Sequence, residues 1–172
     1  MAQALLVVFN LLLREGADEL DDEALLPLLT LCSGLSDTKQ LQTMSVAMIQ
    51  ALDTNYSGGA CFEDFAAAMR GTQADWATVR LFVSEQRRAA DALFGRICRK
   101  GDNMNLNLLK QYIKLQNLAT EAKEANSCAL AMLAGAPALD RDEFAGRFLQ
   151  AQLDPSSAWH LVVDAAAQVL AH

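Results

Sequence analysis

The chain has 172 residues, of which 52% are apolar and 20% charged, and its formal net charge is −7. This length allows one domain or two small lobes, and the apolar share is too high for a disordered chain. The excess of acidic residues argues against a general nucleic-acid binder, which needs a basic footprint. With only three prolines and nine glycines, the composition favours helices.

The first predicted element is a helix over residues 1–13, the most apolar stretch of the chain. It is too short to span a bilayer, and Gln3 and Asn10 interrupt it. It lacks the basic start of a signal peptide, and the acidic run 15–23 follows where a cleavage site would be needed. We therefore expect a core helix, no membrane span and a cytoplasmic protein.

Cysteine spacing indicates neither a disulfide framework nor a zinc site, because no two cysteines lie close together in the sequence. We expect four reduced, mostly buried thiols: Cys32, Cys61, Cys98 and Cys128. His160 and His172 are expected at a helix end or on the surface.

Apolar residues recur with helical spacing almost throughout, and no segment shows sustained strand-like alternation. One predicted helical stripe consists of Leu41, Met44, Met48 and Leu52, and another of Val79, Phe82, Val83, Ala90, Leu93, Phe94 and Ile97.

Between two predicted helices, residues 53–64 carry oxygen-bearing side chains at alternate positions. Asp53, Asn55 and Ser57 are followed by Gly58 and Gly59, and Asp64 stands twelfth. A hard cation requires several oxygens around a curled loop, and glycine permits the sharp turn in its middle. The segment resembles the EF-hand calcium loop. The resemblance implies metal ligands at Asp53, Asn55, Ser57, the carbonyl of Gly59, and Asp64.

This loop departs from the EF-hand pattern in ways that weaken metal binding. Asp64 replaces the usual bidentate glutamate, and Ala60 replaces a branched apolar residue that pairs with a neighbouring loop. Only two side-chain ligands are carboxylates. We expect at most one weakly bound Ca²⁺ or Mg²⁺.

Three weaker copies of the motif are expected at residues 13–24, 94–113 and 129–148. None of them has a full set of ligand side chains. Asp140 with Glu143 is a helix-start signal independent of ancestry. The residues expected to pair between neighbouring loops are Leu20, Ala60, Leu106 and Leu139.

These elements predict an all-α fold, with EF-hand-like helix–loop–helix pairs in two lobes and an additional C-terminal helix. The expected lobes are residues 1–72 and 73–153, similar to the calmodulin and myosin-light-chain group, and an amphipathic helix occupies residues 154–172. An unrelated helical bundle is the alternative fold.

The predicted C-terminal helix begins near Asp154, and Trp159 stands at its start. Its expected apolar face consists of Leu161, Val162, Ala165, Val169 and Leu170. This helix either covers the hydrophobic surface of a lobe or is a further core helix, and it is also a candidate for self-association.

Charge is divided unevenly along the chain. Residues 1–69 have 2 basic and 10 acidic residues, and residues 70–124 have 10 basic and 6 acidic residues. The basic cluster of Arg87, Arg88, Arg96, Arg99 and Lys100 suits a solvated helix face or an acidic partner surface.

No motif for catalysis is present, since the glycine-containing segments lack the lysine of a phosphate-binding loop and no local Cys–His motif occurs.

We predict a non-enzymatic, calmodulin-like binding protein of the light-chain or adaptor type, associated with the cytoskeleton. It would hold an amphipathic, basic helix of a protein partner largely without calcium. The candidate partner-binding residues are Phe9, Leu28, Met44, Met48, Phe65, Met69, Phe94, Ile113, Phe144 and Phe148. A calcium sensor with one working loop and a self-associating helical protein are the alternatives.

Overall fold

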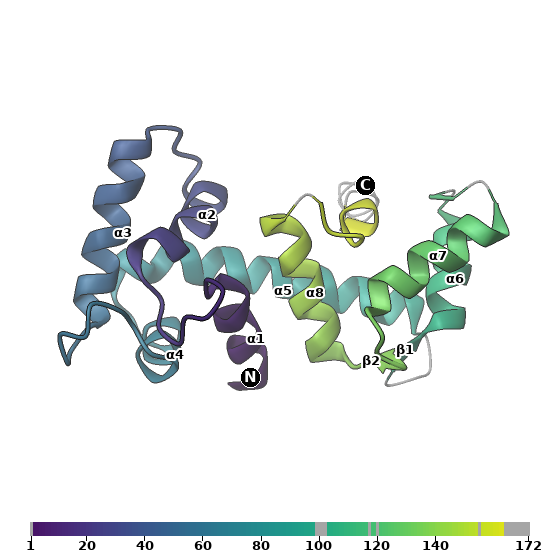
Figure 1. Ribbon diagram of the computed structural model, residues 1–172, viewed down its shortest axis with the longest axis horizontal. Coiled ribbons are helices and arrows are strands. Elements are labelled where there is room, and N and C mark those ends of the chain that lie inside the picture. Colours follow the sequence, from purple (N-terminus) through teal and green to yellow (C-terminus); the bar gives the residue numbers. More distant parts are fainter. Residues whose placement is uncertain (1, 99–102, 117, 120, 155, 164–172) are drawn as a thin grey trace. The chain divides into compact units, whose positions relative to one another are not determined.

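The computed structural model describes residues 2–98, 103–116, 118–119, 121–154 and 156–163. The described chain is mostly helical, as predicted, and its two strands have two residues each (Figure 1). In chain order the elements are α1 (Ala2–Leu12), α2 (Asp22–Ser33), α3 (Thr38–Leu52), α4 (Phe62–Arg70), the 3₁₀ helix η1 (Ala74–Trp76), α5 (Ala77–Ile97), β1 (Met104–Asn105), α6 (Leu106–Leu115), α7 (Ala122–Leu133), β2 (Ala138–Leu139) and α8 (Arg141–Leu153).

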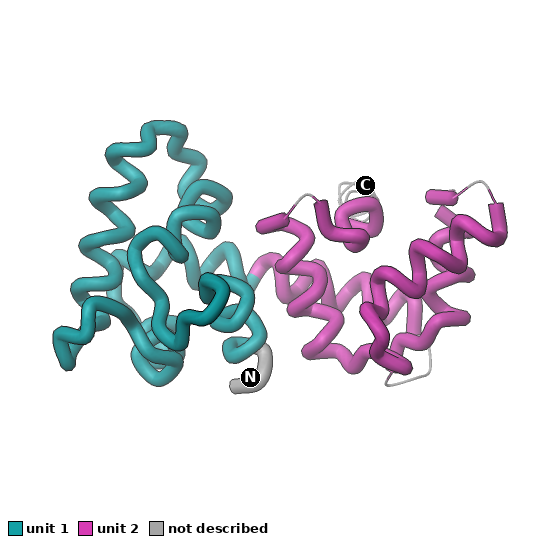
Figure 2. Tube along the Cα trace, viewed as in Figure 1, with its two compact units in different colours: residues 1–84 teal, residues 85–172 magenta. Residues whose placement is uncertain are grey.

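The chain divides into two compact units, residues 1–84 and residues 85–172 (Figure 2). The division lies inside α5, later in the chain than residue 72, where the sequence places the end of the first lobe. We call the two parts unit 1 and unit 2.

In unit 1, α1 packs on α4 and α2 packs on α3. Helices α2 and α3 begin where the carboxylates of Asp21 and Asp37 accept backbone hydrogen bonds from the first turn, at 2.8 and 2.9 Å. An antiparallel bridge joins Leu20 to Ala60 through two backbone hydrogen bonds of 2.9 and 2.8 Å. The two connections of unit 1 therefore meet at the residue pair that the sequence predicts.

The N-terminal helix is a core helix, as predicted. Leu5, Val8, Phe9 and Leu12 of α1 are all buried. In the part of the chain that the structure describes, no helix is long and apolar enough to cross a membrane.

In unit 2, α6 packs on α7, and β1 pairs antiparallel with β2. Met104 lies opposite Leu139, so the prediction that Leu106 would pair with Leu139 is wrong. The cause is Asn105, whose side chain accepts two backbone hydrogen bonds of 3.1 Å and starts α6 at the next residue. Leu106 is therefore already helical, and the buried Met104 takes the pairing position.

Helix α8 begins with the predicted capping pair. The Asp140 carboxylate accepts a hydrogen bond from the Glu143 amide at 2.8 Å, and the Glu143 carboxylate accepts one from the Asp140 amide at 2.9 Å. Both orphan amides at this helix end are thereby satisfied.

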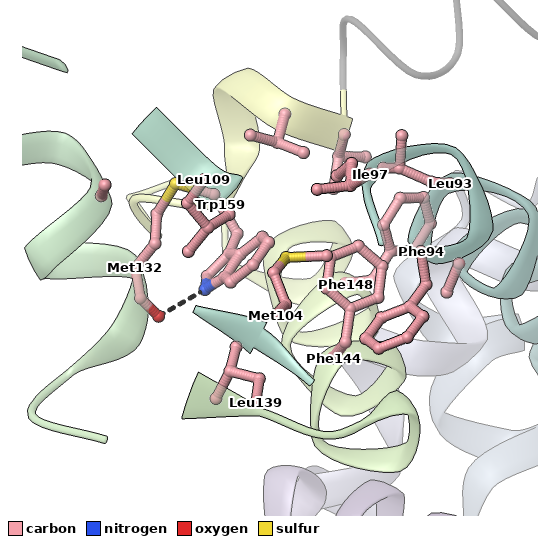
Figure 3. Packing of buried hydrophobic residues seen from close by; sticks show 14 of the residues in the cluster. Leu93, Phe94, Ile97, Met104, Leu109, Met132, Leu139, Phe144, Phe148 and Trp159 are labelled. Carbon is pink, nitrogen blue, oxygen red and sulfur yellow. Dashed lines mark hydrogen bonds between the residues drawn. The ribbon is translucent and has the colours of Figure 1, made fainter. Parts of the chain in front are cut away.

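Unit 2 has a core to which α5, α6, α7, α8 and the segment after α8 all contribute (Figure 3). Trp159, Val162 and Val163 belong to this core. Leu161, which we expected on the same apolar face, is 50% exposed, so that prediction is wrong for this residue. The other predicted members of the face, Ala165, Val169 and Leu170, lie outside the described residues.

Candidate functional site

The connection between α3 and α4 folds around the carboxylate of Asp53. Its Oδ1 accepts a hydrogen bond from the Ser57 amide and its Oδ2 one from the Gly58 amide, both at 2.8 Å. Asn55 Oδ1 accepts a second bond from the Ser57 amide at 2.9 Å. The Ser57 hydroxyl lies 3.4 Å from Asp53 Oδ1 and 3.3 Å from the Gly59 carbonyl oxygen. The loop thus brings together four of the five predicted metal ligands.

Glycine is required at two places in this loop for different reasons. Gly58 has a φ of +93°, in the region that disfavours side chains. A Cβ at Gly59 would lie 2.8 Å from Glu19 Cβ and 3.2 Å from the Leu20 carbonyl oxygen. The absence of a side chain at Gly59 therefore permits the two connections of unit 1 to approach closely enough to pair.

The fifth predicted ligand, Asp64, contacts a different group. Its carboxylate accepts a hydrogen bond from the Cys61 thiol at 3.0 Å. This bond raises the pKa of Cys61, because it stabilises the protonated thiol. Among the described residues, no three His, Cys, Asp or Glu side chains are grouped to hold a metal ion. The oxygens gathered by the loop are largely amide, hydroxyl and carbonyl groups, which suit only a hard cation bound weakly.

The first loop of unit 1 has a protein cation beside its acidic residues. The Arg14 guanidinium contacts the carboxylates of both Asp21 and Glu23. Because Arg14 and Glu23 are more than half exposed, water screens these ion pairs. The contacts nevertheless place a positive charge against the acidic side chains of this loop.

Ion pairs also join α5 to the beginning of α8. Arg87 contacts Asp142 and lies 3.4 Å from Asp91, and Arg141 lies 3.6 Å from Asp91 and over the Phe94 ring. A pocket of about 310 Å³ beside these pairs is lined by Phe94, Asp140, Arg141 and Asp142. Arg87 of the predicted basic cluster therefore serves contacts within unit 2. Arg99 and Lys100 lie outside the described residues.

The thiols show no sign of activation. All four cysteines are free, and burial raises the pKa of Cys32, Cys98 and Cys128. Since the thiolate is the nucleophile, a raised pKa lowers reactivity at neutral pH.

The residues predicted to line a partner-binding surface lie mainly inside the two units. Met44 and Met69 are partly exposed. The others are buried: Phe9, Leu28, Met48 and Phe65 in unit 1, and Phe94, Ile113, Phe144 and Phe148 in unit 2. A partner helix can reach these eight only if a segment that now covers them moves away.

In unit 2 one such segment is residues 157–163, which we call the plug segment. Trp159 is 2% exposed, and its Nε1–H donates a hydrogen bond of 2.9 Å to the carbonyl oxygen of Met132 (Figure 3). Its ring meets Phe144 edge-on, with the ring centroids 5.2 Å apart. Met132 lies in the last turn of α7, where carbonyl groups have no partner within the helix. Sequence reasoning placed Trp159 at a helix start but did not identify this acceptor.

The sequence comparisons do not assign the chain to a known group. A scan against protein-family models finds no match. A search of curated proteins finds no significant relative.

Proposed function

We propose that the protein is a non-enzymatic, EF-hand-like binding protein that holds an amphipathic helix of a protein partner, largely without calcium. The contact of the plug segment with unit 2 is the observation that carries this proposal. Residues 160–163 form a helical turn, and Trp159, Val162 and Val163 are buried in the core of the unit. Unit 2 thus holds a helical apolar segment of its own chain, which is the mode of contact that proteins use for partner helices.

Protein groups hold the loops of both units in shape, which supports binding without calcium. Backbone hydrogen bonds join Leu20 to Ala60 in unit 1 and strand β1 to strand β2 in unit 2. Arg14 lies against the acidic side chains of the first loop. A unit closed by its own groups does not need a metal ion to close it.

The charge distribution supports a basic partner for unit 1. Residues 1–84 have 4 basic and 11 acidic residues, whereas residues 85–172 have 10 of each. Unit 1 therefore carries the whole net charge of the chain, and a basic helix would be attracted to it.

Binding of two designed peptides to the full chain tests the proposal. The peptides are amphipathic helices with the same apolar face, one with basic and one with acidic polar residues, and neither contains tryptophan. In chelator, the basic peptide should bind with an affinity that added calcium changes by less than about threefold, whereas calcium-gated binding would change it by far more. The acidic peptide should bind at least about tenfold more weakly, since like charges repel. Failure of both peptides to bind at millimolar concentration would overturn the proposed function.

A metal sensor with one working loop is the second candidate function. The gathering of oxygens from Asp53, Asn55, Ser57 and Gly59 supports it. Calorimetry of the chelator-treated chain with Ca²⁺ and with Mg²⁺ tests it directly. A sensor requires heat that Asp53→Ala abolishes and that Asp75→Ala, a change in η1 far along the chain from the loop, leaves intact. No heat at millimolar metal would eliminate this candidate.

A further inference from the structure

The two units contain the same series of three buried aromatic rings. In unit 1, Phe9 contacts Phe65 at 5.7 Å between ring centroids, and Phe65 contacts Trp76 at 5.8 Å. In unit 2 the series is Phe94, Phe144 and Trp159, with distances of 5.5 and 5.2 Å. In both units the tryptophan meets the central phenylalanine edge-on.

The sequence position of each tryptophan is also the same relative to its unit. Trp76 follows the last residue of α4 by six positions, and Trp159 follows the last residue of α8 by six. A valine comes three positions after each tryptophan, and Val79 and Val162 are both fully buried. Each unit is therefore closed by a Trp-x-x-Val segment supplied by the chain that follows its last helix.

The two closing segments differ in their place along the chain. Trp76 stands between α4 and α5, and Arg80 of α5 donates hydrogen bonds to the carbonyl oxygens of Ala68 at 3.0 Å and Gln73 at 2.8 Å. The plug segment follows α8, and its contacts include the apolar core of unit 2 and the bond from Trp159 to Met132. Displacing Trp76 would require moving the start of α5, a helix of 21 residues that continues into unit 2, so we take the closing segment of unit 2 as the one that a competitor displaces.

We propose that the Trp159 and Val162 pair is an intramolecular ligand of unit 2 that a partner helix replaces. That partner is an amphipathic helix presenting a tryptophan and a β-branched residue three positions later, on a face without net charge. We infer that the contact face of the partner helix has no net charge for two reasons. Unit 2 has equal numbers of basic and acidic residues, and residues 156–163, which the partner would replace, contain no Asp, Glu, Lys or Arg. This inference rests on the proposed function and specifies the partner and its regulation in unit 2.

Competition with a synthetic plug peptide, having the sequence of residues 154–172, tests the inference on the full chain. A ligand tethered to its own site acts at an effective concentration of about a millimolar, so wild-type protein should bind the labelled peptide at least about tenfold more weakly than the Trp159→Ala variant. The Val162→Ala variant, which removes a smaller side chain than Trp159→Ala, should also bind the labelled peptide more tightly than wild type. Leu161→Ala, which alters an exposed residue of the same segment, should behave as wild type. A peptide with alanine in place of its tryptophan should not bind any of these proteins.

The indole N–H resonances of the wild-type protein, measured by NMR, provide a second test that does not depend on whether a variant folds. Plug peptide at millimolar concentration should shift the Trp159 signal and leave the Trp76 signal unchanged. If neither variant gains affinity and the Trp159 signal does not respond, the inference is overturned. Dimerisation of the wild-type chain that the peptide reverses would assign the site to a second copy and would equally overturn it.

The two proposals fail separately. Binding of the tryptophan-free basic peptide without binding of the plug peptide would reject this inference alone. Loss of both interactions would reject the proposed function as well.

Discussion

At the scale of single residues, Gly59 permits the connection that contains Leu20 to approach the connection that contains Ala60. We expect Gly59→Ala to destabilise the protein by about 1–3 kcal/mol, because the new Cβ would meet Glu19 Cβ and the Leu20 carbonyl oxygen. Gly95→Ala is the control: it lies within α5 with open space around its Cβ, and alanine favours helices. Urea unfolding followed by circular dichroism measures both. Equal stability of the two variants would show that the Leu20–Ala60 bridge tolerates a side chain.

The two tryptophans allow the hydrogen bond of the plug segment to be measured. Trp159→Phe removes the donor to Met132 and leaves a buried carbonyl unpaired, so we expect a loss of about 1–3 kcal/mol beyond the loss of ring volume. Trp76 Nε1 is buried and has no acceptor among the described residues. Trp76→Phe should therefore lose only the part of the unfolding free energy that comes from the larger ring. Thermal unfolding of both variants gives the comparison. A larger loss for Trp76→Phe would contradict the assigned bond.

The contact between Cys61 and Asp64 has a consequence for thiol reactivity. The hydrogen bond raises the pKa of Cys61, so the thiolate forms at higher pH than in an ordinary cysteine. In Asp64→Asn the carboxylate acceptor is lost, and we expect the pH profile of Cys61 alkylation to move to lower pH. Mass spectrometry of digested protein measures Cys61 and Cys128 in the same sample. The profile of Cys128, whose pKa is raised chiefly by burial, should not move.

At the scale of elements, some features could be predicted from local signals and others only from the resemblance to the EF-hand loop. The capping pair of Asp140 and Glu143 and the core face of α1 could be predicted from neighbouring residues, whereas the pairing of Leu20 with Ala60 was implied by the resemblance. The pairing partner of Leu139 could not be predicted. A side-chain cap at Asn105 shifts the start of α6 past the strand, and apolar spacing alone does not distinguish Met104 from Leu106 as the extended residue.

The partners of individual side chains were harder to predict for a physical reason. A long polar side chain can reach several partners once the backbone has folded. The contacts of Arg14 with Asp21 and of Arg87 with Asp142 therefore have no sequence signature. The acceptor of Trp159 is likewise a backbone carbonyl, which every residue has. The recurrence of Trp-x-x-Val at equal distances from two helix ends is a sequence signal, but its meaning requires knowing where α4 and α8 end.

The Arg14 contacts predict a salt-dependent stability of unit 1. Replacing Arg14 with methionine leaves the acidic loop without its protein cation, and we expect a loss of at most about 1 kcal/mol at low salt because the pairs are exposed. In about 1 M salt the loss should nearly vanish through screening. Urea unfolding at both salt concentrations tests this. A loss that persists in high salt would show that Arg14 acts through packing instead of charge.

At the scale of the whole molecule, the two units share a plan and differ in charge. Both are closed by three aromatic rings and a valine, yet unit 1 has 4 basic and 11 acidic residues whereas unit 2 is balanced. The chain has 52% apolar residues, and each unit buries apolar residues of its own. If each unit binds a helix, the three aromatic rings and the valine that both units share account for the apolar contacts. The difference in net charge then determines whether a unit favours a basic helix.

This difference predicts opposite salt responses for the two binding events. Binding of the tryptophan-free basic peptide relies on attraction to acidic unit 1, so raising the salt from low concentration to about 0.5 M should weaken it at least about tenfold. Binding of the plug peptide to the Trp159→Ala variant relies on apolar burial, and the same change should alter it by less than about twofold. Fluorescence anisotropy of the two labelled peptides measures both on the full chain. An equal salt response would place the peptides on the same surface and would contradict the division of partners between the units.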